Sequence, residues 1–233
     1  MKKNKHNIFI ACDTTSLLEV KKIIKLTKND HLNIGYKFGL EFFNSKKGRS
    51  FISKLPDHYI IWLDLKLNDI PSTVASSIYS LKDLKNVRFL TVHASGGYEM
   101  MKEAKLAVKK VNKKIKVLAV TVLTSFSEKL IKQTGHTKSI KNIVIQQASL
   151  AKKAGVDGIV CSGHEVKLIK NICKQMQIIT PGIRLKGDTK QDQKRIMTPS
   201  QAFYNGATGV VIGRSITKGN IKHNISKLIT SLK

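Results

Sequence analysis

The sequence predicts one (β/α)8 barrel that spans residues 1–233 as a single domain. Apolar, β-branched runs alternate with amphipathic stretches along the whole chain, and alternation of this kind is typical of a parallel sheet. Eight such units occur in 233 residues, which is the unit count of this barrel and close to its usual length of about 250 residues. No break in composition and no linker-like segment divides the chain, so we expect one barrel and no second domain.

The eight expected strands are short runs rich in Ile, Val and Leu. They are Ile8–Cys12, Asn33–Phe38, Tyr59–Leu65, Arg88–His93, Lys116–Val122, Gly158–Cys161, Gln177–Thr180 and Thr208–Ile212. Apolar residues three and four positions apart predict helices between them, at Ser16–Thr27, Gly97–Val111, Ser139–Ala154 and His164–Met176. An open, doubly wound sheet is the alternative, but neither G-x-G-x-x-G nor G-x-x-x-x-G-K-[ST] occurs in the sequence.

Composition excludes several classes of protein. With 41% apolar residues the chain can bury a core without disulfides. The three cysteines are odd in number and contain no CxxC pair, which indicates reduced thiols in a cytoplasmic protein. The N-terminal apolar stretch, Ile8–Cys12, is too short for a secretion signal, and no apolar run approaches about 18 residues. We therefore expect no membrane span.

The formal net charge is +27, from 42 Lys and Arg against 15 Asp and Glu. Such an excess suggests a polyanionic partner. However, the basic residues are mostly lysines spread along nearly every segment, and aromatic residues make up only 6% of the chain. No basic stretch carries the interleaved aromatics of a single-strand binder. We expect solvated helix faces and no specific nucleic-acid site; steeply salt-dependent binding to DNA would indicate the opposite.

Polar side chains collect where the expected strands end. Because barrel active sites lie at the carboxyl ends of the strands, these side chains should converge on one mouth. We expect only a structural role for His93, the histidine of this group. The group comprises Asp13 after the first strand, Lys37 in the second, Asp64 and Lys66 in the third, His93 ending the fourth, Thr124 after the fifth, Arg184 after the seventh and Arg214 after the eighth.

The stretch IIWLDLKLNDIPSTV, residues 60–74, places charges at the end of a strand that is otherwise apolar. Side chains two residues apart on a strand share a face, so Asp64 and Lys66 should point the same way, with Asp69 just beyond. On spacing alone, a strand-end salt bridge explains the pattern as well as a catalytic site does.

The connection between Pro181 and Pro199 is long for a barrel, where such loops usually have about 2–6 residues. Arg184 and Gln193 lie within it, and VIGRSI follows the last strand at 211–216. A Gly-Arg pair at the start of a helix offers backbone N–H donors and a guanidinium to a phosphate. We interpret the long connection as a lid over a phosphate site; the alternative is that the arginines pair with surface carboxylates.

The stretch DLKLNDIPST resembles the D-x-K-x-x-D-I-P-x-T signature of the orotidine 5'-phosphate decarboxylases of bacteria. Small departures occur at Leu67, Asn68 and Ser215, where bacterial members usually carry Phe, His and Pro, and none of them affects a charged position. Eight further blocks resemble the family in the same order: ACD at 11–13, YKFGLEFF at 36–43, TVHASGG at 91–97, VTVLTS at 120–125, VCSGHE at 160–165, PGIR at 181–184, DQKRIMTP at 192–199 and VIGR at 211–214.

This resemblance implies decarboxylation of orotidine 5'-monophosphate in pyrimidine biosynthesis by a cytoplasmic homodimer, with no metal and no cofactor. An alternating network of Lys37, Asp64, Lys66 and Asp69 would stabilise a carbanion at C6, and Lys66 would protonate it. The residues implied to come from the neighbouring subunit are Asp69, Ile70 and Thr73.

The remaining residues of the site would bind the substrate. By the same resemblance, Asp13 and Lys37 hold the ribose hydroxyls and Thr124 hydrogen-bonds the pyrimidine. The residues implied to hold the 5'-phosphate are Gln193, Gly213 and Arg214, with Arg184 in the same lid.

Sugar-phosphate enzymes of the same superfamily share the D-x-K-x-x-D core and are the alternative. They include 3-keto-gulonate 6-phosphate decarboxylase and hexulose-phosphate synthase, which use a magnesium-bound enediolate and need an additional acidic ligand. The I-P-x-T continuation and the DQKR block favour the pyrimidine substrate.

Overall fold

The computed structural model describes residues 6–188 and 196–232, and its eight parallel strands close into a barrel in the order β1 to β8. The predicted barrel is therefore confirmed, and the expected strands differ from the observed ones by at most two residues at either end. The strands are β1 (Asn7–Ala11), β2 (Asn33–Gly39), β3 (Ile60–Leu67), β4 (Val87–His93), β5 (Lys116–Val120), β6 (Gly158–Val160), β7 (Gln177–Thr180) and β8 (Gly209–Ile212).

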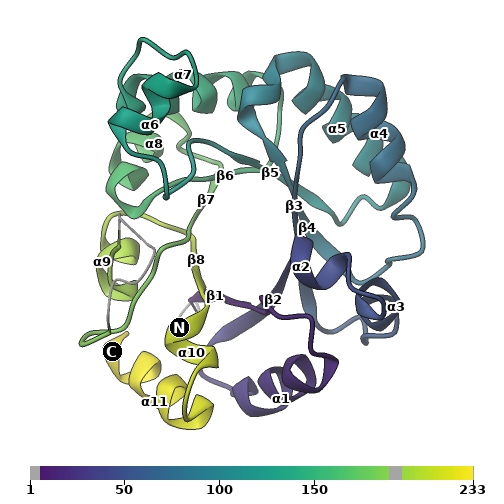
Figure 1. The fold of residues 1–233 in the computed structure, drawn as a ribbon, viewed down its shortest axis with the longest axis vertical. Helices are drawn as coiled ribbons and strands as arrows, with labels where there is room; N and C mark the ends of the chain where they lie inside the picture. The colour runs from purple at the N-terminus through teal and green to yellow at the C-terminus, as the bar shows by residue number, and fades with distance from the viewer. Residues whose placement is uncertain (1–5, 189–195, 233) are drawn as a thin grey trace.

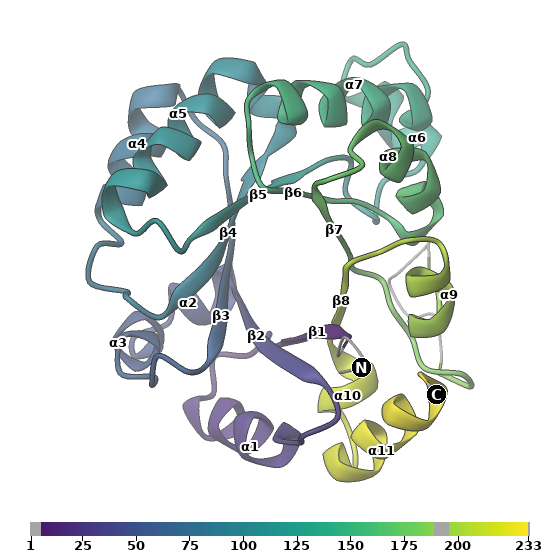
Figure 2. The same ribbon diagram turned by 180° about the vertical axis from the view of Figure 1, so that it is seen from behind.

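Helices surround the ring of strands on all sides (Figures 1 and 2). The longest, α5 and α7, match two of the predicted helices closely. Every helix within the described ranges is too short or too polar to span a lipid bilayer. The α-helices are α1 (Leu17–Thr27), α2 (Leu40–Phe43), α3 (Gly48–Ser53), α4 (Pro71–Tyr79), α5 (Gly97–Val111), α6 (Glu128–Gln133), α7 (Ile140–Lys153), α8 (Val166–Ile172), α9 (Pro199–Tyr204), α10 (Arg214–Thr217) and α11 (Ile221–Ser231).

The helix expected over His164–Met176 is divided in the structure. A 3-10 turn, η2 (Gly163–Glu165), precedes α8, which ends at Ile172. Ser162 and Glu165 form a capping box at the start of this turn, with the Glu165 carboxylate accepting the Ser162 backbone N–H. The periodic apolar pattern predicted a helix correctly here, but it did not register the tighter first turn set by the cap.

The barrel has two apolar layers because successive strand residues face opposite sides. On β1, Ile8 and Ile10 pack outward against the helices, whereas Phe9 and Ala11 fill the interior. Inside the barrel, Phe9 packs edge-on against Trp62, with ring centroids 4.9 Å apart. Bulky side chains such as these fill the middle of the interior and separate a cavity at the carboxyl ends of the strands from one of about 360 Å³ at their amino-terminal ends.

The long connection after β7 is anchored at both of its ends. Ile183 and Met197 form a parallel bridge, and the Arg184 N–H donates to the Met197 carbonyl at 3.0 Å. Gln193, which the sequence assigned to the phosphate site, lies outside the described residues. The anchoring fixes the backbone of Arg184 beside the barrel mouth.

Candidate active site

A cavity of about 560 Å³ opens at the carboxyl ends of the strands. The polar side chains that the sequence placed at the strand ends converge there from different strands, as expected for a barrel. The predicted residues that line it are Asp13, Lys37, Asp64, Lys66, Thr124, Arg184, Gly213 and Arg214.

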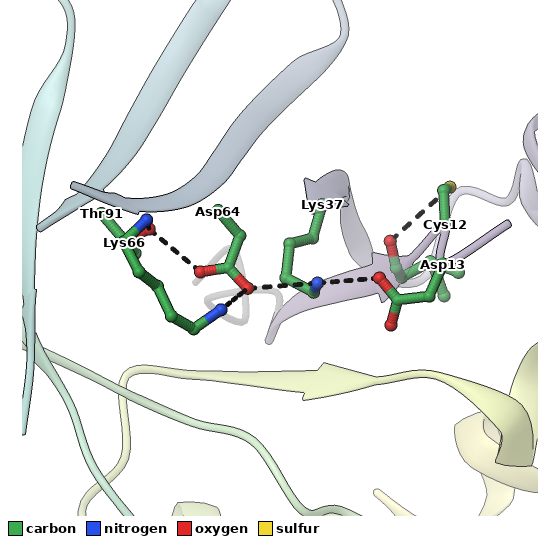
Figure 3. A network of polar contacts seen from close by, with 7 residues as sticks. Cys12, Asp13, Lys37, Asp64, Lys66 and Thr91 are labelled. Atoms are coloured by element: carbon green, nitrogen blue, oxygen red, sulfur yellow. Dashed lines mark hydrogen bonds and ion pairs between the residues drawn. The ribbon is translucent and has the colours of Figure 1, made fainter. Parts of the chain in front are cut away.

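Four charged side chains form a continuous row across one side of this cavity, with alternating sign (Figure 3). Lys37 Nζ lies 3.1 Å from Asp13 Oδ1 and 3.2 Å from Asp64 Oδ2, and Lys66 Nζ lies 2.8 Å from the same Asp64 oxygen. Asp64 thus pairs with two ammonium groups through one oxygen. The side chains of Lys37 and Asp64 are each only 10% exposed, whereas that of Lys66 is 31% exposed and faces the cavity.

Lys66 reaches this row because β3 is irregular at this point. The pairing of β3 with β4 shifts between Leu63 and Leu67, so that residues 64 to 66 lie opposite a single β4 residue, Thr91. Lys66 has φ 49°, and it is the only non-glycine residue with positive φ among those described. A bulge of this kind redirects a side chain next to an active site. Asp64 and Lys66 do meet, as predicted, but not through the regular strand alternation used to predict it.

Thr91 fills the gap that the bulge leaves between the two strands. Its hydroxyl accepts the Lys66 backbone N–H at 2.9 Å and donates to Asp64 Oδ1 at 3.0 Å. No role was expected for Thr91 from the sequence, although it lies in the TVHASGG block. Its alternation with Phe89 and His93 on β4 places it on the inner face, and that signal was available in the sequence.

The electrostatic balance favours the charged forms of both central residues. Burial raises the pKa of Asp64, but Lys37, Lys66 and the hydrogen bonds from Lys66 and Thr91 outweigh it, so the pKa lies below 3.8. Burial lowers the pKa of Lys37, but Asp64 and Asp13 outweigh it, so the pKa lies above 10.5. Asp64 and Lys37 therefore keep their charges across the ordinary pH range.

His93 ends β4 on the same inner face. Its pKa lies below 6.5 because of burial and the nearby Lys66 ammonium, which Asp64 only partly offsets. The side chain is half-buried and lies outside the set that lines the cavity. A neutral histidine beside the charged row fits the structural role expected for it, which stays a prediction.

A second group of cations lines the cavity from the loops after β7 and β8. Gly213 and Arg214 begin the short helix α10, and Arg184 comes from the anchored segment after β7. Arg184 is 7% exposed and donates to the Ile183 carbonyl at 3.0 Å. The expected anion site thus has cations from the two adjacent loops after β7 and β8.

Three residues assigned to a neighbouring subunit lie together at the start of α4. Asp69, Ile70 and Thr73 are exposed, and Ile70 keeps 63% of its surface accessible. Asp69 accepts the N–H of Ile70 at 2.7 Å and lies outside the set that lines the cavity of its own chain. Within one chain, therefore, the structure does not bring Asp69 to Lys66.

The cavity also has lining residues that the sequence did not single out. Trp62 lies two residues before Asp64 on the same inner face and forms part of the floor. Glu19, Thr217 and Lys218 lie at the rim. Within residues 6–188 and 196–232, no three His, Cys, Asp or Glu side chains gather in a way that could hold a metal ion.

Comparisons with known proteins agree on one family. The model of the orotidine 5'-phosphate decarboxylase / HUMPS family matches residues 6–225. Orotidine 5'-phosphate decarboxylase of a Wolbachia species from Brugia malayi is 42% identical over 224 residues, which is 95% of this chain and 96% of that protein. The Staphylococcus saprophyticus enzyme of the same name is 45% identical over 185 residues, covering 78% and 80% of the two chains.

A solved structure has the same fold over nearly the whole length. The crystal structure of orotidine 5'-phosphate decarboxylase from Lactobacillus acidophilus superposes with a TM-score of 0.84 at 32% sequence identity. The match covers 98% of this chain and all of that one.

Replacing the shared anion tests the electrostatic balance of the row. Asp64→Asn keeps the shape but leaves the buried Lys37 and the nearby Lys66 without their common carboxylate. We expect a loss of about 3–5 kcal/mol in the free energy of unfolding at pH 7, as for one-sided removal of a buried ion pair. Urea denaturation measures it, and Asp83→Asn, which removes an exposed pair with Arg49, is the control with an expected loss of about 1 kcal/mol or less.

The pH dependence has a defined sign. Because the folded-state pKa of Asp64 lies below 3.8, its stabilisation is present above 3.8 and is lost as the pH falls through the folded value. The difference in the free energy of unfolding between the unsubstituted protein and Asp64→Asn should therefore decrease below pH 3.8. A difference that stays constant from pH 7 down to about pH 2 would contradict this assignment.

Proposed function

The chain belongs to the orotidine 5'-phosphate decarboxylase / HUMPS family, and we propose that it converts orotidine 5'-monophosphate to uridine 5'-monophosphate and CO₂ in the cytoplasm, in pyrimidine biosynthesis. The chain is accordingly a carboxy-lyase, the class for which its relatives are named. The observation that carries the proposal is the row from Asp13 to Lys66, with two ammonium groups on one buried carboxylate at the barrel mouth.

The reaction breaks the bond between C6 of the pyrimidine and its carboxylate. CO₂ leaves and the bonding electron pair stays at C6, in the plane of the ring, where it cannot delocalise. A fixed cation next to C6 stabilises this charge as it develops. We assign this role to Lys66, which then donates a proton from its ammonium to C6 and completes the product.

Asp64 would serve the reaction in two ways. It holds Lys66 charged and in place through the 2.8 Å contact. It also sets a negative charge beside the substrate carboxylate, and this repulsion disappears as CO₂ departs. Both effects favour the transition state over the bound substrate. Lys37 supports Asp64 from the other side and extends the row toward Asp13.

Substrate binding would use the rest of the cavity. We assign the ribose hydroxyls to Asp13 and Lys37 and the pyrimidine to Thr124, and all three residues line the cavity. We assign the 5'-phosphate to Gly213, Arg214 and Arg184, together with Gln193 of the undescribed segment. Binding of a phosphate far from C6 contributes energy that positions the ring against Lys66.

The active protein would be a homodimer with sites shared between subunits. Asp69, Ile70 and Thr73 are exposed and lie apart from the lining of their own cavity. We propose that they enter the cavity of the second subunit and that Asp69 there becomes a second anionic partner of Lys66. The network that the family resemblance implies consists of Lys37, Asp64, Lys66 and Asp69, and it is complete only in this dimer.

The first prediction is activity without added metal. The purified protein should convert orotidine 5'-monophosphate at the same rate with and without EDTA, because stabilisation at C6 comes from Lys66. The loss of substrate absorbance measures the rate. Activity that vanishes with EDTA and returns with magnesium would assign the chain to the sugar-phosphate branch instead, and 3-keto-gulonate 6-phosphate should then be the substrate that turns over.

Arg214→Ala should weaken the binding of phosphorylated ligands. A charge-assisted contact of this type contributes roughly 1.5–3 kcal/mol, so KM should rise roughly 10- to 100-fold. Orotidine without its phosphate should react at an unchanged rate, and Arg49→Ala, on the surface, is the control. An equal loss with the phosphate-free nucleoside would remove Arg214 from the phosphate site.

Mixing two inactive variants tests the shared site. Lys66→Ala and Asp69→Ala should each be nearly inactive alone. In a two-fold dimer each site takes Lys66 from one chain and Asp69 from the other, so a mixed dimer has one site with both lesions and one with neither. With random exchange, roughly a quarter of the original activity should return.

The control is exchange itself, followed with two differently tagged chains. If both residues act within a single chain, every site stays damaged, and verified exchange with no recovery of activity would refute the shared site.

A further inference from the structure

Thr91 connects the two residues on which the proposed chemistry depends, without contributing to the cavity surface. It lies on β4 with 0% of its surface exposed and is not among the lining residues. Its hydroxyl accepts the Lys66 backbone N–H at 2.9 Å and donates its proton to Asp64 Oδ1 at 3.0 Å. The other Asp64 oxygen, Oδ2, is the one that meets Lys66 Nζ and Lys37 Nζ.

One of these hydrogen bonds acts on the backbone of Lys66, and the other acts on the carboxylate of Asp64. The Lys66 backbone is held in the left-handed region, at φ 49°, which a residue with a Cβ adopts only when its surroundings stabilise it. The bulge removes the β4 backbone partner that a regular ladder would offer at this point, since three β3 residues oppose Thr91 alone. The Thr91 hydroxyl takes the place of that partner.

We propose that Thr91 is a positioning residue, whose hydroxyl fixes the backbone of Lys66 and the carboxylate orientation of Asp64 in the geometry needed for decarboxylation. This inference rests on the proposed function and extends it to a residue that touches no substrate. Thr91 acts only through Asp64 and Lys66.

A hydroxyl suits this position because a single atom both accepts and donates a hydrogen bond. A valine has the same shape and can do neither, whereas a serine keeps both capacities. The Thr91 hydroxyl binds Asp64 Oδ1, so Oδ2 points toward the two ammonium groups. This hydrogen bond holds Asp64 in place between Lys37 and Lys66. The donated bond also stabilises the carboxylate form, in the same direction as the two lysines and against the effect of burial.

The experiment compares paired substitutions at Thr91. Thr91→Val removes the hydroxyl and keeps the volume. Thr91→Ser and Thr91→Ala both remove the methyl group, so the difference between these two isolates the hydroxyl. Thr208→Val is the control: Thr208, just before β8, accepts the Ile178 N–H of β7 through Oγ1 at 2.9 Å, at the opposite end of the barrel.

We expect kcat to fall roughly 10- to 100-fold in Thr91→Val and Thr91→Ala, the loss that corresponds to one hydrogen bond to a charged group. KM and the affinity for uridine 5'-monophosphate, followed by the fluorescence of Trp62, the single tryptophan, should stay within about twofold because the phosphate and ribose contacts are intact. Thr91→Ser should retain near-normal kcat. Thr208→Val should lower the melting temperature like Thr91→Val but leave kcat unchanged.

The decrease of kcat at acidic pH, the acid limb of its pH profile, provides a second test of the role of Thr91. Asp64 faces Lys37 on β2, Lys66 on β3 and His93 on β4, and it is linked to Asp13 after β1 through Lys37. Without the Thr91 hydroxyl, Asp64 should protonate at a higher pH, and the acid limb should move to higher pH in Thr91→Val and Thr91→Ala. The Asp64 carboxyl carbon, titrated by NMR, should move in the same direction, and this reading needs no activity.

The outcomes separate the two proposals. A wild-type protein without decarboxylase activity would refute the proposed function, while the NMR titration would still decide whether Thr91 controls Asp64. A normal kcat and acid limb in both Thr91→Val and Thr91→Ala would overturn the positioning role. It would also be overturned if Thr91→Ser lost as much kcat as Thr91→Ala, since the methyl group and not the hydroxyl would then matter.

Discussion

The buried carboxylate of Asp64 is the interaction on which the rest of the site depends. A lone carboxylate in this position would be neutralised, because burial disfavours its charged form. Two lysines and a threonine reverse that outcome, and they come from three adjacent strands of the barrel. In return, Asp64 keeps Lys37 charged although Lys37 is itself buried. The two buried charges, Lys37 and Asp64, thus stabilise each other.

The bulge in β3 explains how a rigid barrel can present such a row. A regular strand would place Asp64 and Lys66 about 7 Å apart along the strand axis, on one face, at about 3.3 Å per residue. The irregular pairing and the left-handed backbone at Lys66 bring the ammonium back onto the Asp64 oxygen. A strained residue held by its surroundings is common at functional sites. Here Thr91 is the group that holds it.

The cavity separates two tasks between its two sides. Fixed, alternating charges lie on β1 to β3, and the arginines lie on the loops after β7 and β8. In the proposed reaction, the arginine side binds a dianion that does not change, and the other side meets the charge that develops at C6. This arrangement lets binding energy from a distant group position the reacting carbon, so that the tightest contacts need not be those at the point of chemistry.

Much of this protein was determined by its sequence alone. The alternation of apolar runs and amphipathic stretches located eight strands within two residues at each end, because each period reflects local burial. The polar residues at the strand ends located Asp13, Lys37, Asp64 and Lys66, since strand ends meet at one mouth in any such barrel. Two features of the site could be found only from the tertiary structure. Strand alternation is a local rule, whereas the bulge at Lys66 and the bridging role of Thr91 depend on the register between β3 and β4, which no single segment encodes. The place of Asp69 in the charge network, which the family resemblance implies, would likewise be set by contact with the surface of a second subunit.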